Sequence, residues 1–395
     1  MPIFPLQVPA PARRAAPIAL LVAALAVAGC DSPAAEGPLA PTAPAVRPDA
    51  DAQNTALATA TVFATGLRFP RGLTFGPDGF LYVAEAGNGG THSTTGQCKQ
   101  VVPPVGPYTN GHTARISRIG PNGNRSTVAF GFPSAAAAIG DVNGVADVAF
   151  IGNQLYALVS GGGCSHGSGT PAGIAKVSPT GDWSIVADLS AYQAKHPVAH
   201  TEPADFEPDG TWYSMLAQNG KLFAVEPNHG EVVRIVPGTW KVSRIVDVSA
   251  SKGHIVPTAL AERFGNFYFG NLGTFPVTPG TEKVFQLKTD GTLILAKGGF
   301  TTVLGLDFDS RGRMYVLETT HGAGFPTPGT GRVVRVNGDG TRQVIVNGLF
   351  FPTAMQFGPD DRLYISNKGF GPPQPGEILR VDVPGVTPAA SVAAK

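Results

Sequence analysis

One short pattern recurs six times along the chain and limits the folds that are open to it. Each copy has a short apolar strand, a turn rich in Gly, Asp or Asn, and a second strand with an aromatic residue at its second position. These aromatic residues lie 74, 67, 45, 47 and 49 positions apart, and they are Tyr82, Tyr156, Phe223, Tyr268, Tyr315 and Tyr364. Such spacing is typical of four-stranded propeller blades. The sequence therefore predicts an all-β, six-bladed β-propeller with long loops in its first two blades.

The last copy of the pattern is one strand short. It has strands at 354–357, 363–366 and 378–383 before a tail rich in Pro and Ala. We expect residues 59–64 to supply the fourth strand, because pairing the first strand with the last blade closes the ring and leaves no exposed sheet edge. A run of separate β-sandwich domains is the alternative, and the nearly constant spacing of the later copies disfavours it.

The composition agrees with a turn-rich globular protein. The chain has 51 Gly and 36 Pro among 395 residues, and 43% of its residues are hydrophobic, which is enough for a packed core. Its 29 Lys and Arg nearly balance 28 Asp and Glu, and no basic run occurs. A nucleic-acid binder needs a basic surface, so no nucleic-acid partner is expected.

The first residues are typical of an export signal. Arg13 and Arg14 precede an apolar run, and small residues lead to Cys30. The sequence Val27-Ala28-Gly29-Cys30 resembles a bacterial lipobox, which implies cleavage before Cys30 and lipidation of that cysteine. A plain secretory signal and a short membrane helix are the alternatives, although ten apolar residues are few for a bilayer span.

These features divide the chain into four parts. We predict a lipoprotein signal peptide (1–29), an Ala/Pro-rich tether (30–57), the propeller (58–384) and a C-terminal tail (385–395). The tether has almost no large apolar residues and cannot form a core. The expected location is the cell envelope, on the periplasmic or extracellular side, with the membrane as partner through the lipid at Cys30.

Polar residues end the second strands of five copies, where a propeller brings strand ends around its central channel. They are Glu85, Glu226, Asn271, Glu318 and Asn367. Carboxylate and amide oxygens in a ring suit a hard divalent cation such as Ca2+ or a polar ligand, so all five are candidate metal and ligand residues. Neighbouring loops add the ligand-binding candidates Asn228, His229 and His321. The alternative is that these residues only cap strand ends.

The propeller region contains two cysteines, Cys98 and Cys164. Both fall in the long loops that follow the second strands of the first two blades, and therefore on one face of neighbouring blades. In an oxidising compartment we expect them to form a disulfide. Two free thiols are the alternative.

Two further motifs are weak matches to known sites. Residues 205–210 alternate acids before a Gly, as a calcium loop does, but Leu216 stands where a calcium loop has Glu. Residues 163–167 read Gly-Cys-Ser-His-Gly, which matches the residue pattern of a nucleophile elbow. The strand-to-helix turn that the elbow needs is not expected there. We expect no catalytic residue at either place.

The copy at 66–85 resembles an NHL-type propeller repeat. More narrowly, the chain resembles the ScyD/ScyE family, propeller proteins encoded with genes for the pigment scytonemin. The resemblance lies in the segments 107–113, 161–164, 226–231 and 270–272. It implies a six-bladed propeller outside the cytoplasm and no particular reaction. The third blade departs from the family, because Gly210-Thr211-Trp212-Tyr213-Ser214 stands where an Asn-Pro-Tyr-Gly-like entry is expected.

Two functions remain open from the sequence. The first is a membrane-tethered binding propeller that presents the channel-mouth face to a small molecule or a partner protein, without enzyme activity. The second is a lactonase-like hydrolase in which a central divalent cation polarises the substrate carbonyl. A quinone-dependent sugar dehydrogenase is a weaker third possibility, because no cofactor-binding set can be placed on these residues.

Overall fold

The computed structural model describes residues 57–100 and 102–386, which all belong to one compact unit, Asp49–Lys395. The predicted signal peptide, Cys30, nearly all of the tether and most of the tail lie outside the described residues. The described chain is almost entirely β-structure, with two short α-helices, α1 (Leu189–Lys195) and α2 (Val248–Lys252). None of its helices is long and apolar enough to cross a membrane.

The strands form six antiparallel sheets, which confirms the predicted all-β, six-bladed arrangement. Blade 1 contains β2 (Pro70–Phe75), β3 (Leu81–Glu85), β4 (His92–Ser93), β5 (Thr109–Ile119), β6 (Arg125–Ala136) and β7 (Val142–Asn143). Blade 2 contains β8 (Val145–Ile151), β9 (Gln154–Val159), β10 (Gly173–Val177) and β11 (Trp183–Asp188). Blade 3 contains β12 (Ser214–Gln218), β13 (Lys221–Glu226), β14 (Glu231–Val236) and β15 (Lys241–Asp247).

The last three blades repeat the four-stranded order. Blade 4 contains β16 (Pro257–Arg263), β17 (Asn266–Asn271), β18 (Glu282–Leu287) and β19 (Leu293–Phe300). Blade 5 contains β20 (Val303–Phe308), β21 (Met314–Glu318), β22 (Gly331–Val336) and β23 (Arg342–Leu349). Blade 6 contains β24 (Ala354–Phe357), β25 (Leu363–Asn367), β26 (Pro375–Val381) and the N-terminal strand β1 (Ala60–Arg68).

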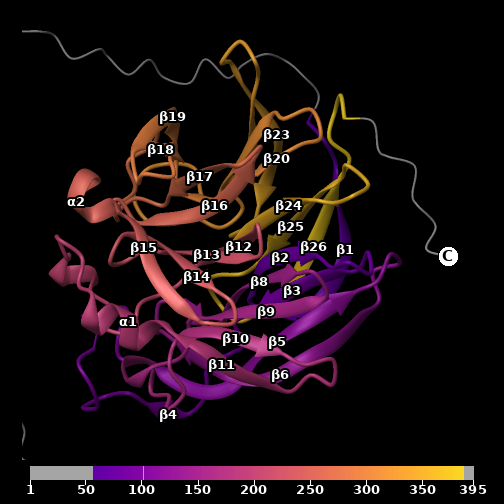
Figure 1. Ribbon diagram of the computed structural model, residues 1–395. Helices are drawn as coiled ribbons and strands as arrows, with labels where there is room; N and C mark the ends of the chain where they lie inside the picture. The colour runs from indigo at the N-terminus through magenta and orange to yellow at the C-terminus, as the bar shows by residue number, and fades with distance from the viewer. Residues whose placement is uncertain (1–56, 101, 387–395) are drawn as a thin grey trace, which may run out of the picture. The chain divides into compact units, whose positions relative to one another are not determined.

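The ring closes as the sequence predicts. The inner strands β2, β8, β12, β16, β20 and β24 contact one another in that order, and β24 contacts β2. Strand β1 pairs antiparallel with β26, from Ala60 opposite Val381 to Arg68 opposite Pro375, and Figure 1 shows the indigo β1 beside the yellow β26. The closing strand extends beyond the expected 59–64, since it continues into the entry of blade 1. The N-terminal strand thus removes the free edge of blade 6.

The repeated aromatic residue joins each blade to the next. Tyr82 packs edge-on against Phe150, which lies near the end of the inner strand of blade 2, with ring centroids 4.9 Å apart. The same contact occurs in three other blades, as Tyr268 with Phe308, Tyr315 with Phe357, and Tyr364 with Phe75. Edge-to-face pairs of this kind stabilise beyond the burial of their area. The periodic aromatic residue therefore packs one blade against the next in the closed propeller.

The turn before the second strand fixes the tyrosine. The Tyr82 hydroxyl donates to Asp78 at 2.9 Å, and Tyr364 donates to Asp360 at 3.0 Å. In blade 5 the Tyr315 hydroxyl donates to Asp309 at 3.0 Å. The Asp in these turns therefore gives the buried phenol a partner and holds the ring against the next blade.

Candidate functional site

The ends of the second strands and the entries to the inner strands lie on one side of the ring, called here the loop face. Glu85, the last residue of β3, lies opposite Pro70, the first residue of β2. Asn271 and Pro257 take the same positions in blade 4, and Glu318 and Val303 in blade 5. The structure thus places the predicted strand-end residues on this face.

Each of these strand-end residues binds a neighbouring segment of the chain. The side-chain oxygen accepts a hydrogen bond from a backbone N–H near the inner-strand entry in four blades. The pairs are Glu85 with Arg68 (2.6 Å), Glu226 with Thr211 (2.8 Å), Glu318 with Thr301 (2.8 Å) and Asn367 with Phe350 (2.9 Å). In blade 4, Asn271 instead donates to the Ile255 carbonyl at 3.0 Å. In these four blades the contact caps the turn into an inner strand.

Two of the three carboxylates also have an arginine partner. Glu85 binds Arg115 at 2.8 Å, and Glu318 binds Arg332. Glu226 also accepts the backbone N–H of His229 at 2.6 Å. All three carboxylates are fully buried. They therefore hold the blade together, as the strand-capping alternative requires.

The side chains predicted to hold a divalent cation are Glu85, Glu226, Asn271, Glu318 and Asn367, and all five already have hydrogen-bond partners. Within residues 57–100 and 102–386, no three His, Cys, Asp or Glu side chains lie close enough to hold a metal ion. Each of these side chains binds a backbone group near an inner-strand entry. A Ca2+ site at these five residues remains a prediction from the sequence.

The centre of the loop face is spanned by one side chain from the third blade. The Tyr213 hydroxyl donates to the Thr353 carbonyl at 2.7 Å, and these residues enter blades 3 and 6, which are opposite in a six-membered ring. Arg71, at the entry of blade 1, is buried beside it and binds Asp141 at 2.7 Å. The predicted channel mouth is therefore crossed by a hydrogen bond between opposite blades.

The inner strands and Tyr213 line a half-open pocket of about 330 Å³. Asp147 lines it and accepts the backbone N–H of Met215 at 2.8 Å, so it joins blade 2 to blade 3. Asp307 accepts the N–H of Phe357 at 2.7 Å and joins blade 5 to blade 6. Burial raises the pKa of Asp147 to about 7 and that of Asp307 to about 6. Both carboxylates brace neighbouring inner strands.

We predict that Tyr213→Phe lowers the free energy of unfolding by about 1 to 3 kcal/mol, because the Thr353 carbonyl loses its partner across the channel. Urea unfolding followed by tryptophan fluorescence measures the loss. The matched control is Tyr268→Phe, since the contact described for Tyr268 is made by its ring and the ring remains. Equal stability of the Tyr213 variant and the native chain would contradict the bridging role.

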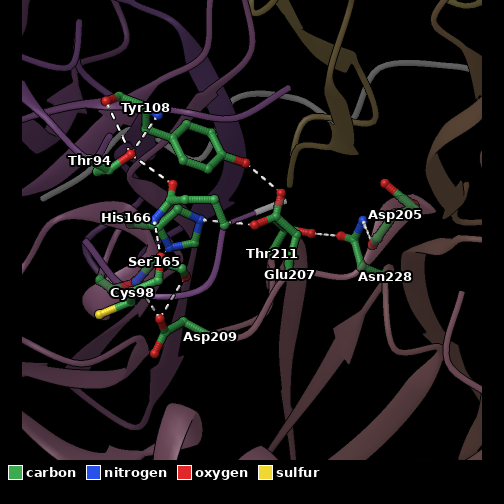
Figure 2. Close-up of polar contacts among 12 residues, drawn as sticks. Thr94, Cys98, Tyr108, Ser165, His166, Asp205, Glu207, Asp209, Thr211 and Asn228 are labelled. Atoms are coloured by element: carbon green, nitrogen blue, oxygen red, sulfur yellow. Dashed lines mark hydrogen bonds and ion pairs between the residues drawn. The ribbon is translucent and has the colours of Figure 1, made fainter. Parts of the chain in front are cut away.

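The densest polar cluster on the loop face surrounds residues 205–209, called here the hub segment (Figure 2). Its three acids point to three different places. Asp205 binds His254 at 2.9 Å, Glu207 accepts from the Tyr108 hydroxyl, and Asp209 accepts from Ser165 Oγ at 2.6 Å. The hub segment therefore joins loops of blades 1, 2 and 4 to the entry of blade 3. Its alternating acids serve this purpose rather than calcium binding.

Two predicted ligand residues belong to the same cluster. The Asn228 side chain donates to the Asp205 carbonyl at 3.0 Å, and His229 Nε2 lies 2.7 Å from the Glu207 carbonyl. The Phe206 ring stacks on His229 with centroids 4.9 Å apart. The third, His321, lies outside the hub and is 3.7 Å from Glu318. Asn228 and His229 thus support the hub segment.

Cys98 and Cys164 form a disulfide, as predicted, with their Cα atoms 5.8 Å apart. Cys164 opens the short 3-10 turn Cys164–His166, which carries Ser165 and His166 into the cluster. Both of these side chains are fully buried, and Ser165 binds Asp209 rather than His166. This arrangement agrees with the expectation that the Gly-Cys-Ser-His-Gly motif is not a nucleophile elbow.

A surface pocket of about 460 Å³ lies on the loop face of blade 4. Phe285, Leu295 and Ile255 give it apolar walls, and the cationic side chains of Lys252 and Lys283 line it as well. The other lining residues are His254, Asn271, Gly273, Thr274, Thr281 and Glu282. Of the predicted ligand residues, Asn271 is the one that lines this pocket.

The neighbouring loops carry two exposed phenylalanines. Phe275 follows Thr274 of the pocket and is 47% exposed, and Phe325, on the corresponding loop of blade 5, is 77% exposed. The two loops are joined because Val277 and Gly324 exchange backbone hydrogen bonds of 2.6 and 3.0 Å. The two rings are therefore exposed on loops that are fixed to each other.

Comparisons with known proteins agree with the fold. A Bacteroides thetaiotaomicron protein of unknown function is 12% identical, with a TM-score of 0.51, over 82% of this chain and 72% of that one. A Thermus thermophilus protein assigned as a glucose dehydrogenase is 16% identical, with a TM-score of 0.50, over 82% and 100%. A Xanthomonas campestris gluconolactonase is 10% identical, with a TM-score of 0.48, over 83% and 90%. Likenesses at these identities establish the fold alone.

No protein-family profile and no curated protein matches the chain. The resemblance to the ScyD/ScyE family therefore remains a prediction from the sequence.

Proposed function

We propose that this chain is an exported, lipid-anchored propeller that binds a small molecule with an apolar body and a negative group at its loop face. The observation that carries this is the blade 4 pocket, where the apolar side chains of Phe285 and Leu295 lie beside the ammonium groups of Lys252 and Lys283. Ligand pockets commonly combine apolar walls with a few polar groups that orient the ligand. We infer a small molecule rather than a partner protein because the feature is concave.

The pocket polarity supports an anionic ligand. Its carboxylate, Glu282, already binds Thr281 Oγ1 at 2.8 Å and the side chain of Asn271. His254 is paired with Asp205. Lys252 and Lys283 are exposed at the pocket, where Lys283 Nζ donates to the Thr281 carbonyl at 2.8 Å and Lys252 Nζ lies 5.6 Å from the centroid of the Phe285 ring. Their charges favour a carboxylate, sulfonate or phosphate. Phe275 and Phe325 would then extend the apolar contact beyond the pocket.

The disulfide supports an oxidising compartment, because such bonds persist mainly outside the cytoplasm. This agrees with the proposed envelope location and with an anchor at Cys30. Metabolic labelling with an alkyne fatty acid tests the anchor. Label on the native chain that is lost in Cys30→Ala supports it, and equal labelling of both chains contradicts it.

Ligand binding is tested by thermal shift with phenyl phosphate, phenylacetate and the neutral phenylacetamide. We expect the two anions to raise the Tm and phenylacetamide to have little effect, because only the anions engage Lys252 and Lys283. The double variant Lys252→Ala, Lys283→Ala should lose the shift. The double variant Lys176→Ala, Lys241→Ala removes two exposed charges elsewhere and should keep it. Equal shifts with charged and neutral probes, or a shift that survives in the pocket variant, would contradict the proposal.

The alternative function is a metal-dependent lactonase, and the same thermal-shift assay can test it. It would need the strand-end carboxylates to exchange their present hydrogen-bond partners for the metal. Calcium chloride compared with a chelator in the same thermal shift separates the two functions. A Tm rise with calcium that Glu226→Gln removes would favour the hydrolase.

A further inference from the structure

Two buried polar atoms in the hub cluster face each other without a hydrogen bond. His166 Nε2 and Glu207 Oε2 are 3.6 Å apart, and neither has another hydrogen-bond partner. Their residues are 0% and 1% exposed. Figure 2 shows this pair at the centre of the cluster, with Tyr108 and Asp209 on either side. A buried polar atom that lacks a partner is costly, so the contact between these two atoms calls for an explanation.

The remaining hydrogen bonds determine where protons are. His166 Nδ1 lies 2.7 Å from the Gly162 carbonyl, which can only accept, so Nδ1 carries a hydrogen. In the neutral ring, Nε2 therefore presents a lone pair to Glu207 Oε2. The other oxygen of Glu207 already accepts from the Tyr108 hydroxyl. With an ionised Glu207, two lone pairs would face each other, so a proton must lie between the two residues.

We propose that Glu207 carries this proton toward His166 Nε2, that the shared proton fastens the loops of blades 1 and 2 to the hub segment, and that its loss at alkaline pH releases them. The three side chains come from separate loops, since Tyr108 follows β4, His166 follows β9, and Glu207 precedes β12. One O–H group would then complete a chain from Tyr108 through Glu207 and His166 to the Gly162 carbonyl.

The surroundings favour the proton on the carboxyl group. Burial, followed by nearby carboxylates, raises the pKa of Glu207 to about 8, although the Tyr108 bond lowers it. Burial lowers the pKa of His166. The charged and titratable groups around the pair are already engaged with one another. They are Asp141 with Arg71, Asp205 with His254, Asp209 with Ser165, Glu226 with the N–H of His229, and Lys99 over Phe206.

The sign of the pH effect follows from these shifts. Glu207 binds a proton more strongly in the folded chain than in the unfolded chain, so its contribution to stability is lost as the pH rises toward 8. His166 has a lowered pKa, so it affects stability only below its ordinary value of 6.5. Between pH 6.5 and 8, the pH dependence of stability that this pair causes therefore comes from Glu207. The pKa of Asp147 also lies in this window, but Asp147 is present in both chains that are compared, so its contribution to the difference cancels.

The test compares the native chain with Glu207→Gln. The amide oxygen can accept from Tyr108 while the amide N–H donates to His166 Nε2 at every pH. Unfolding of the native chain releases the proton of Glu207, whereas Glu207→Gln has no such proton to release. Relative to this variant, we expect the unfolding equilibrium constant of the native chain to rise by up to about tenfold per pH unit between pH 6.5 and 8. Urea unfolding at four pH values measures this. Glu202→Gln makes the same substitution at another carboxyl group of the same loop and should follow the native profile.

A second measurement uses the native chain alone and is independent of how the variant folds. Long-range ¹⁵N–¹H spectra report which ring nitrogen of His166 carries hydrogen. We expect a neutral ring with hydrogen on Nδ1 from pH 7 to 9. An imidazolium at pH 7, hydrogen on Nε2, or parallel pH profiles for the native chain and Glu207→Gln would each overturn the proposal.

Discussion

Glu318→Ala is expected to lower the free energy of unfolding by about 3 to 5 kcal/mol. The carboxylate is fully buried between the guanidinium of Arg332 and the backbone N–H of Thr301. Its removal leaves the Arg332 charge, whose side chain is 10% exposed, without its buried partner. The large loss comes from that unpaired charge and not from the removal of a favourable surface contact. Urea unfolding with circular dichroism measures it.

The control replaces both partners. Glu318→Met with Arg332→Met removes the pair together and fills similar volume with apolar groups, so it should recover most of the stability. This outcome separates a bracing role from ligand binding, because a ligand-binding carboxylate on a stable frame could be removed without loss of fold. Native stability in Glu318→Ala would contradict the bracing role and return Glu318 to the candidate ligand residues.

The fold could be predicted because its determinants repeat along the chain. Tyr82 and its equivalents recur once per blade, and in four blades the ring packs against the inner strand of the next blade. Likewise, the shortage of one strand in the last copy predicted the pairing of β1 with β26. Both signals are local patterns with a fixed period, which a single sequence displays directly.

The site could be predicted only in part, because its contacts join loops that are distant in sequence. The strand ends were placed on the correct face, but whether Glu85 turns toward the channel or toward Arg68 depends on side-chain direction, which no pattern records. The acids of the hub segment were visible, yet their partners Tyr108 and His166 lie on other loops. The unusual entry to the third blade was a signal, since it contains Tyr213.

Cys98→Ala with Cys164→Ala is expected to lower the free energy of unfolding by about 4 kcal/mol, within a usual range of about 2 to 5. The cross-link spans 66 residues of sequence, and removing it returns the corresponding loop entropy to the unfolded chain. Thermal unfolding with and without a reductant measures the effect. The native chain should lose stability on reduction, whereas the variant should be insensitive to it. A loss below about 1 kcal/mol would mean that the two loops are held by other contacts.

The disulfide and the hub pair should also depend on each other. Cys164 opens the turn that carries His166, so without the cross-link the imidazole is no longer held opposite Glu207. Combining the double cysteine variant with Glu207→Gln completes a double-mutant cycle. We expect an interaction energy above about 0.5 kcal/mol at pH 8, because groups in one network couple whereas distant sites add. Additive losses would show that the disulfide stabilises the loops through the unfolded chain alone, without positioning His166.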